Sequence, residues 1–272
     1  MTTVSVEQVN FYPLKSGRGI RTAAAPLRAT GLEWDRHWMI ADATGKFLSQ
    51  RTHPQLARIV PEIGDGELIL QAPGRAALHV PLAPGGREQA VSVWQDHFEG
   101  LDQGEAAAAW VSELMGEPAR LLRVPQTVRR LARAEFAGPQ PAPVTFVDGY
   151  PLLVCNRASL DELNTRMPEP VPMERFRPNL VLTGLPPFAE DRIASLAVGA
   201  VRLNLVKPCT RCSITSTDQR TGELSTNPLP VLRQFRFDHT LHGVTFGENA
   251  VIAQGVGELI ERGADCTVTY ES

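Results

Sequence analysis

Two cysteines separated by two residues, Cys209 and Cys212, are the side chains of this sequence best suited to chemistry. A thiolate is both a nucleophile and a ligand for soft metals. A structural zinc site needs four donors, usually in two pairs, and the available second pair is His239 and His242. A redox dithiol normally begins a helix, whereas Ser-Ile-Thr-Ser-Thr follows Cys212 and is a poor helix start. Both of these readings are therefore weak, and simple burial of the two thiols stays open.

The residues around the two cysteines are basic or carry hydroxyl groups. Lys207 and Arg211 supply positive charge, and the hydroxyl groups belong to Thr210, Ser213, Thr215 and Thr217. Positive charge favours a thiolate, and guanidinium and hydroxyl groups donate hydrogen bonds to anions. We therefore expect a thiolate beside an anionic ligand.

Three further clusters could contact an anion. Lys15-Ser16, followed by Gly17, offers a point charge and a hydroxyl group, but it lacks the spacing of a P-loop. Asp35-Arg36 precedes a strand-like segment, and so does Arg177-Pro178-Asn179. Taken singly, a solvated strand end, a surface ion pair and an ordinary loop explain these clusters better than a site does.

Composition bounds the class of protein. The chain has 272 residues, 43% of them hydrophobic and 21% charged, which is ordinary for a globular protein of one or two domains. A net charge of -3 gives no overall attraction for nucleic acid, so any anion site must be local. The sequence has no signal-peptide pattern and no long apolar run, so we expect a soluble, cytoplasmic protein without a membrane partner. The four cysteines are too few for a disulfide framework and should be thiols.

The elements that must position these clusters are mostly short strands. With 22 glycines and 22 prolines, the chain predicts many turns and few long helices. Residues 3–100 contain short β-like runs, and the segment that begins at Gly104 predicts one amphipathic helix that ends near residue 116. Residues 125–143 have weak periodicity and predict a long excursion or linker, with a domain boundary shortly before it.

The second half repeats this pattern of strands and turns. Residues 144–156 predict a strand, a turn and a second strand. Ser159 and Glu162 form a capping-box pattern that predicts the start of a short helix. Further strand-like runs follow, and Gly199 and Gly257 are expected in the turns between them.

The order and spacing of the four clusters resemble the MOSC superfamily with its N-terminal β-barrel domain, as in YcbX-type bacterial proteins and mitochondrial amidoxime-reducing components. The resemblance extends from about Val4 to Tyr270 and includes Phe-Arg-Pro-Asn, Ser-Leu-Asp-Glu-Leu-Asn and the region of Gly247. It implies an α/β, predominantly β fold, with an N-terminal β-barrel-like domain over residues 1–122. A MOSC β-barrel domain with short flanking helices would cover residues 123–272, and a positively lined cleft would lie between the two.

The resemblance also implies a molybdenum cofactor (molybdopterin) in that cleft and assigns its contacts. Cys212 corresponds to the cysteine that binds molybdenum, whereas the role of Cys209 stays open. The residues implied to bind the cofactor are Lys15, Ser16, Arg36, Arg177, Asn179, Thr210 and Arg211. Gly149 and Tyr150 stand where amidoxime-reducing relatives carry hydroxyl groups. The family is also associated with pyridoxal phosphate binding.

The activity implied is that of an oxidoreductase that reduces N-hydroxylated small molecules, such as hydroxylaminopurines and amidoximes. The sequence offers no cysteine set for an iron–sulfur domain, so a separate ferredoxin or flavoprotein reductase would supply the electrons. Asp148 and Glu248 are candidate proton relays. Two alternatives stay open: a sulfur carrier that holds a persulfide on Cys212, and a module that stores the cofactor without turnover.

Overall fold

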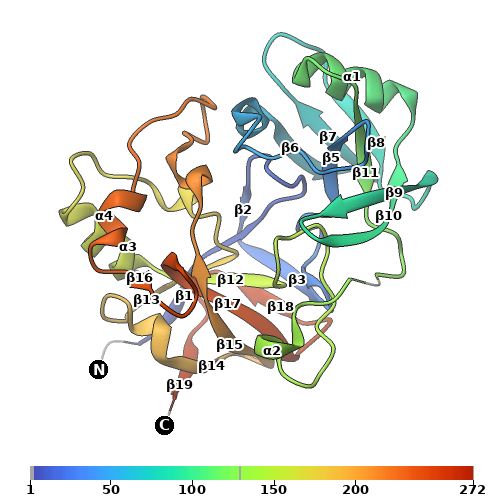
Figure 1. Ribbon diagram of the computed structural model, residues 1–272. Helices are drawn as coiled ribbons and strands as arrows, with labels where there is room; N and C mark the ends of the chain where they lie inside the picture. The colour runs from blue at the N-terminus through green and yellow to red at the C-terminus, as the bar shows by residue number, and fades with distance from the viewer. Residues whose placement is uncertain (1–2, 129, 272) are drawn as a thin grey trace.

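The computed structural model describes residues 3–128 and 130–271 (Figure 1). Strands dominate these residues, with four short α-helices and four 3-10 helices among them. The helices are α1 (Glu105–Met115), α2 (Ala134–Ala137), α3 (Arg157–Thr165) and α4 (Leu229–Arg233), and the 3-10 helices are η1 (Pro54–Arg58), η2 (Met173–Arg175), η3 (Ala189–Arg192) and η4 (Ser213–Ser216). The prediction of a predominantly β fold is confirmed.

The largest sheet has nine strands. Its order is β19 (Cys266–Tyr270), β14 (Ile193–Val198), β15 (Val201–Thr210), β17 (Gly243–Gln254), β12 (Leu152–Asn156), β13 (Leu180–Thr183), β1 (Ser5–Phe11) and β2 (Ile20–Thr22), with β16 (Phe237–Asp238) paired to β17. The first strand of the chain is therefore part of a sheet otherwise built mostly from the second half. Segments near the two ends of the chain also lie side by side, because the Cys266 amide donates to the Val4 carbonyl at 2.8 Å.

Three smaller sheets complete the fold. The first contains β5 (Trp38–Asp42), β11 (Ala119–Arg123), β10 (Asp96–Asp102) and β9 (Arg87–Val93); the second contains β6 (Val60–Gly64), β7 (Glu67–Gln71) and β8 (Leu78–Pro81); the third contains β18 (Leu259–Glu261), β3 (Ala24–Arg28) and β4 (Gly31–Leu32). Figure 1 shows the β5 and β6 sheets and α1 gathered on one side of the molecule, and the nine-stranded sheet on the other.

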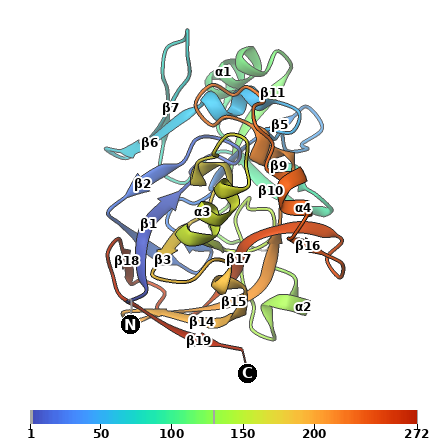
Figure 2. The same ribbon diagram turned by 90° about the vertical axis from the view of Figure 1, so that its left-hand side faces the viewer.

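Separate hydrophobic cores hold these parts. One core lies between the nine-stranded sheet and β3 and contains Val9, Leu27 and Leu203, all fully buried. A second core joins the β5 and β6 sheets to α1, with Trp38 and Val111 at its centre. A third core lies beneath α3, which covers one side of the large sheet in Figure 2.

Strand register brings the predicted site segments together. Because β1 is antiparallel to β13 with Val9 opposite Leu180, the end of β1 lies beside the start of β13. The segment after β1 is also bonded to β5, since the Lys15 amide donates to the Trp38 carbonyl at 2.7 Å. Across β12, β17 and β15, Leu153, Asn249 and Lys207 form one row. The start of β12 and the end of β15 thus reach the same edge.

Most of the predicted elements are present. The helix that ends near residue 116 is confirmed, with Gly116 as its left-handed C-cap.

Three other predictions need correction or refinement. The helix predicted from Ser159 begins earlier, because Asn156 is its N-cap and accepts from the Ala158 amide, while Ser159 is buried inside the helix. Residues 144–147 form no strand; their amides bond to separate segments, such as Phe146 to the Arg36 carbonyl at 3.1 Å.

The third refinement concerns the predicted excursion over residues 125–143. Its described part contains α2, and the Ala132 amide donates to the Ala142 carbonyl at 2.8 Å, so the loop folds back on itself. The predicted turns at Gly199 and Gly257 are confirmed, both with positive φ. Among the described residues, no helix is long and apolar enough to cross a membrane.

Candidate functional site

A cavity of about 430 Å³ lies where these segments meet. Its walls come from the segment after β1, the residues preceding β5 and β13, the start of β12 and the end of β15. All eight residues predicted to hold a cofactor line it: Lys15, Ser16, Arg36, Arg177, Asn179, Thr210, Arg211 and Cys212. Four segments widely separated in sequence therefore converge on one space of the size of a small-molecule site.

The charge of the cavity wall is strongly one-sided. Six lining residues are cationic, namely Lys15, Arg36, Arg51, Arg177, Lys207 and Arg211, and one, Asp148, is anionic. The protein as a whole carries a net charge of -3. The cavity is thus a local concentration of positive charge, as the sequence led us to expect of any anion site.

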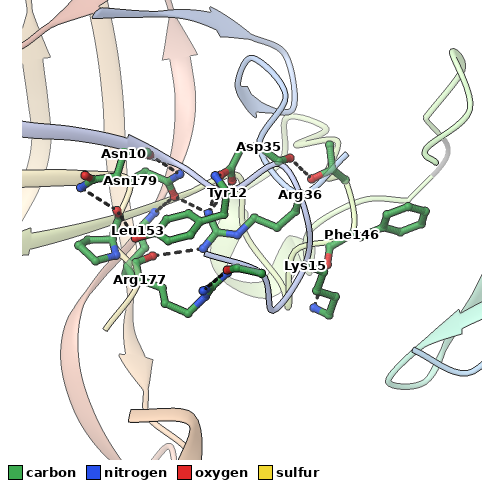
Figure 3. A network of polar contacts seen from close by, with 12 residues as sticks. Asn10, Tyr12, Lys15, Asp35, Arg36, Phe146, Leu153, Arg177 and Asn179 are labelled. Carbon is green, nitrogen blue, oxygen red and sulfur yellow. Dashed lines mark hydrogen bonds and ion pairs between the residues drawn. The ribbon is translucent and has the colours of Figure 1, made fainter. Parts of the chain in front are cut away.

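Arg36 is fixed by a buried carboxylate. Its Nη1 donates to both oxygens of Asp35 at 2.7 Å, and its Nη2 donates to the Arg177 carbonyl at 3.2 Å. Asp35 is fully buried and also accepts from the Tyr12 amide at 2.8 Å. The Asp35-Arg36 pair is therefore a buried, positioned pair that links β1 to β5, and the surface ion pair that the sequence alone allowed is ruled out (Figure 3).

Arg177 reaches into the cavity with unused hydrogen-bonding capacity. Its Nη1 donates to the Gly17 carbonyl at 2.6 Å and to Gln219 Oε1 at 3.3 Å. Its Nη2 is buried and has no hydrogen-bond partner among the described residues. Burial, together with the nearby Arg36 guanidinium, lowers the pKa of Arg177 to about 10. A buried donor without a partner is costly, so this atom marks a place for an acceptor.

Tyr12 lies between the two arginines. The guanidinium carbons of Arg36 and Arg177 are 4.1 and 4.3 Å from its ring centroid, and its hydroxyl donates to the Pro178 carbonyl at 3.1 Å. Burial raises the pKa of this hydroxyl well above its usual range, so the ring stays neutral. Cation–π contacts of this kind hold two like charges close together that would otherwise repel.

Asn179 ties three chain segments together (Figure 3). Its Oδ1 accepts from the Leu153 amide at 3.0 Å, and its Nδ2 donates to the Asn10 carbonyl at 3.3 Å. These bonds connect β1, the start of β13 and β12. With both ends of its amide in use, Asn179 mainly fixes the cavity wall.

Three of the predicted residues have left-handed backbone conformations. Ser16, Arg36 and Arg177 have φ values of 65°, 50° and 56°. Such conformations are unfavourable for residues with a Cβ atom and persist where the surrounding structure fixes them, often at functional sites. The strain therefore coincides with the residues that the sequence identified.

Lys15 and Asp148 form an ion pair on the cavity wall. Lys15 Nζ donates to Asp148 Oδ1 at 2.5 Å and to the Phe146 carbonyl at 2.8 Å. Burial lowers the pKa of Lys15 to about 8, an effect that Asp148 only partly offsets. Burial alone would raise the pKa of Asp148, but the attraction of the Lys15 ammonium outweighs this effect and holds the pKa of Asp148 well below its usual range. The Asp148 side chain is 57% exposed, so solvent screens the pair and its energetic contribution is small.

The two cysteines differ in their surroundings, although both line the cavity. Arg211 Nη1 donates to Cys209 Sγ at 2.9 Å, and its Nη2 donates to the Phe176 carbonyl at 2.7 Å. Cys212 immediately precedes η4, and its carbonyl accepts from the Thr215 hydroxyl at 3.0 Å. The Cys212 thiol receives no hydrogen bond from any described residue. Its sulfur is therefore the one left available to a ligand.

The other two cysteines lie outside the cavity. All four are free thiols, as predicted. Cys155 is buried, and burial raises its thiol pKa well above the usual value. Gly247 has a φ of 74°, and a Cβ atom there would lie 2.5 Å from Cys155 Sγ, so glycine is needed at that position.

Glu248, considered as a proton relay, does not line the cavity. It lies on β17 between Gly247 and Asn249, and Asn249 does line the cavity. Because neighbouring residues of a strand point to opposite faces, Glu248 points away from the site. Burial, with the nearby carboxylates of Asp191 and Glu190, raises its pKa to about 9. Asp148 is the one of the two candidates that lies at the cavity.

Sequence reasoning missed several residues of the wall, among them Arg51 and Trp94. Arg51 lies in a turn without a recognisable motif, and Trp94 lies at the tip of the β9–β10 hairpin. The available indication was Trp94 itself, because two-residue hairpin loops usually carry glycine or asparagine at that position.

Comparison with known proteins gives matches to both halves of the chain. Residues 3–118 match the MOSC N-terminal beta barrel domain, and residues 141–266 match the MOSC domain. The boundary predicted at residue 122 lies between these segments and stays a prediction. The chain is 32% identical over 242 residues to mitochondrial amidoxime reducing component 2 of Bos taurus, covering 85% of this chain and 72% of that protein.

Two other similarities differ in coverage and in identity. The chain is 31% identical over 254 residues to the molybdenum cofactor sulfurase of Danio rerio, covering 86% of this chain but 31% of that protein. Among solved structures, the YUAD protein from Bacillus subtilis aligns over 99% of this chain and 97% of its own, with 10% identity and a TM-score of 0.44.

Proposed function

Because the chain belongs to the MOSC family and carries the family's N-terminal β-barrel domain, we propose that it is a molybdenum-cofactor-dependent reductase of N-hydroxylated compounds. Its substrates would be small molecules such as hydroxylaminopurines and amidoximes. Its electrons would come from a separate ferredoxin or flavoprotein reductase. The observation that carries the proposal is the convergence of all eight predicted residues, from four chain segments, on one cavity.

The residues of the cavity fit a molybdenum cofactor chemically. A pterin dithiolene with a terminal phosphate is strongly anionic, and six cationic side chains line the cavity. The buried Arg177 Nη2 has no partner among the described residues and would gain an acceptor. Cys212 offers a soft donor on the same wall. Pyridoxal phosphate binding stays a prediction from the family resemblance.

Each side chain would have a distinct task. Arg36 and Arg177, held by Asp35 and Gly17, would bind anionic groups with little loss of conformational entropy on binding. Cys212 would be the protein ligand of the metal. When bound, the cofactor supplies the two-electron reduction that, with two protons, breaks the N–O bond and releases water.

Lys15 and Asp148 would handle a proton at the cavity. Lys15 Nζ has a pKa of about 8 and lies 2.5 Å from the Asp148 carboxylate. An ammonium group with a pKa near neutrality can donate a proton and regain it from solvent. The exposed Asp148 carboxylate would connect Lys15 Nζ to water.

A sulfur carrier is the second candidate, in which Cys212 would hold a persulfide. The similarity to a molybdenum cofactor sulfurase favours it, together with the two thiols that line one cavity. The carrier would contain no stoichiometric molybdenum. The cofactor store would contain the metal but would not turn over substrate.

Metal and pterin content separates these candidates. Protein purified from a molybdate-fed host should contain about one molybdenum and one pterin per chain. Cys212→Ser should lose most of the metal, whereas Cys209→Ser, the matched control on the same wall, should retain it. Turnover of benzamidoxime with reduced viologen then distinguishes a reductase from a store. Absence of molybdenum from the wild type would contradict the proposal.

A further inference from the structure

Trp94 is an exposed aromatic residue held in an unfavourable conformation at the cavity. It is the first of two residues that join β9 to β10, and its φ of 58° is left-handed. Glycine or asparagine usually occupies such a turn position. Burial does not offset the strain, since 51% of the residue is exposed. Strain of this kind at a cavity suggests a task for the side chain.

Three contacts fix the indole ring. The Arg51 guanidinium carbon lies 4.4 Å from the ring centroid, and Phe47 packs edge-on with its centroid at 5.2 Å. Trp94 Nε1 donates to Asp148 Oδ1 at 3.1 Å. All four side chains line the cavity. The Arg51–Trp94 stack is therefore a rigid, flat surface at the exposed side of the cavity.

The two oxygens of Asp148 are used unequally. Oδ1 accepts from both Lys15 Nζ and Trp94 Nε1. Oδ2 accepts no hydrogen bond among the described residues, and Arg51 Nη2 lies 3.8 Å from it. The carboxylate is thus oriented by one oxygen and offers the other as an acceptor beside the stack.

We propose that the Arg51–Trp94 stack and Asp148 Oδ2 form a substrate subsite for planar N-hydroxylated compounds that carry an N–H donor beside the N–OH group. The flat surface would stack on a conjugated ring, as aromatic and guanidinium groups do with nucleobases. Asp148 Oδ2 would accept from the neighbouring N–H, fixing the orientation of the N–OH group. This inference rests on the proposed function and adds a preference: aryl and purine substrates over aliphatic ones.

The test compares two amidoximes that share the reacting group and differ in the ring. Binding of benzamidoxime and of acetamidoxime to the holoprotein is measured by titration calorimetry without an electron source, so that neither is consumed. In Trp94→Ala, benzamidoxime should bind about tenfold more weakly and acetamidoxime less than about twofold more weakly, as expected for loss of one stacking partner. Trp94→Phe keeps an aromatic face and should recover most of the difference. In Asp148→Asn, both compounds should weaken by similar factors.

Trp110→Ala is the matched control. Trp110 also packs under an arginine, with the Arg75 guanidinium carbon 5.5 Å from its ring centroid, and its Nε1 donates to the Ala76 carbonyl at 2.8 Å. It lies on α1 and does not line the cavity. Trp110→Ala should change neither affinity.

The possible outcomes separate this inference from the proposed function. With reduced viologen, the ratio of kcat/KM for benzamidoxime to that for acetamidoxime should fall in Trp94→Ala, mainly through KM. If Trp94→Ala weakens the binding of both compounds equally, or of neither, the subsite is overturned while the proposed reductase activity stands. If the wild-type protein contains molybdenum but neither binds nor reduces either amidoxime, the proposed function and the subsite both fail.

Discussion

Two clusters of like charge lie on opposite sides of β17. On one side is the cavity, where Arg36 and Arg177 approach the same tyrosine ring. On the other side is a buried acidic cluster formed by Glu190, Asp191 and Glu248. Both clusters contain buried atoms without a partner among the described residues, Arg177 Nη2 in the first and one oxygen of each carboxylate in the second.

The difference between the clusters lies in how their charge can be relieved. A carboxylate can take up a proton, and burial raises the pKa of both Glu190 and Glu248, the latter to about 9. Arg236 compensates the remaining charge on Asp191, with Nη1 at 2.5 Å from Oδ2. A guanidinium group stays protonated at any physiological pH, so the arginines cannot be neutralised in this way. Asp35 compensates the charge of Arg36, so the charge of Arg177, whose Nη2 has no partner among the described residues, is what favours an anionic ligand at the cavity.

The largest effect should follow from removing a cation of the cavity. Arg177→Met removes the guanidinium whose Nη2 lacks a partner among the described residues. Charge-assisted hydrogen bonds are worth about 1.5–3 kcal/mol, so cofactor affinity should fall about 10- to 100-fold. Pterin and molybdenum content of the purified protein measure this. Arg175→Met is the matched control, because Arg175 is equally buried but bonds to Thr215 and Ser225 and does not line the cavity. Equal cofactor loss in both variants would show that the effect is structural.

The acidic cluster should make stability depend on pH. The pKa of Glu248 is about 9 in the folded protein against an ordinary 4.5, so folding favours the protonated form. The contribution of Glu248 to the free energy of unfolding is therefore complete below pH 4.5. It declines as pH rises towards 9, by up to about 1.4 kcal/mol per pH unit. Glu248→Gln stays neutral and should lose less stability between pH 6 and about pH 9 than the wild type does. Urea unfolding at several pH values tests this.

An exposed carboxylate provides the control for that series. Glu258 is exposed at the turn before β18, so Glu258→Gln should follow the wild-type pH dependence. If Glu248→Gln and the wild type decline in parallel, Glu248 is not the protonated group of the cluster.

The two clusters also differ in how far the sequence predicted them. The cavity was predictable because its residues recur together, in order and spacing, in a family pattern, whereas each cluster taken singly was better explained without a site. Asp35 was underestimated, since a sequence cannot show that an adjacent carboxylate will be fully buried. Trp94 was missed because its role depends on a hairpin that brings it to Arg51, over 40 residues away in sequence.

The acidic cluster was hidden for a different reason. Glu190 and Asp191 are neighbours on η3 but lie far from Glu248 in sequence, and they meet it only when η3 packs against β17. Ser159 had suggested a helix cap, but its hydroxyl is used by this tertiary contact. The fold class and most strands follow from local patterns, whereas irregular segments such as residues 144–147 are set by tertiary hydrogen bonds.

The smallest effect should come from Ser159, which links α3 to the acidic cluster. Its hydroxyl donates to Glu190 Oε2 at 2.8 Å and accepts from the Phe188 amide at 2.7 Å. Ser159→Ala leaves the buried Glu190 carboxyl and the partly buried Phe188 amide without this partner. It should lower the free energy of unfolding by about 1–3 kcal/mol at low pH, measured by urea titration. Glu162→Gln is the control: its contact with Arg166 is an exposed pair on the helix surface and should contribute about 0.5 kcal/mol or less. Equal losses in the two variants would show that both substitutions act only through the stability of α3, whereas a loss confined to Ser159→Ala supports its buried link to Glu190.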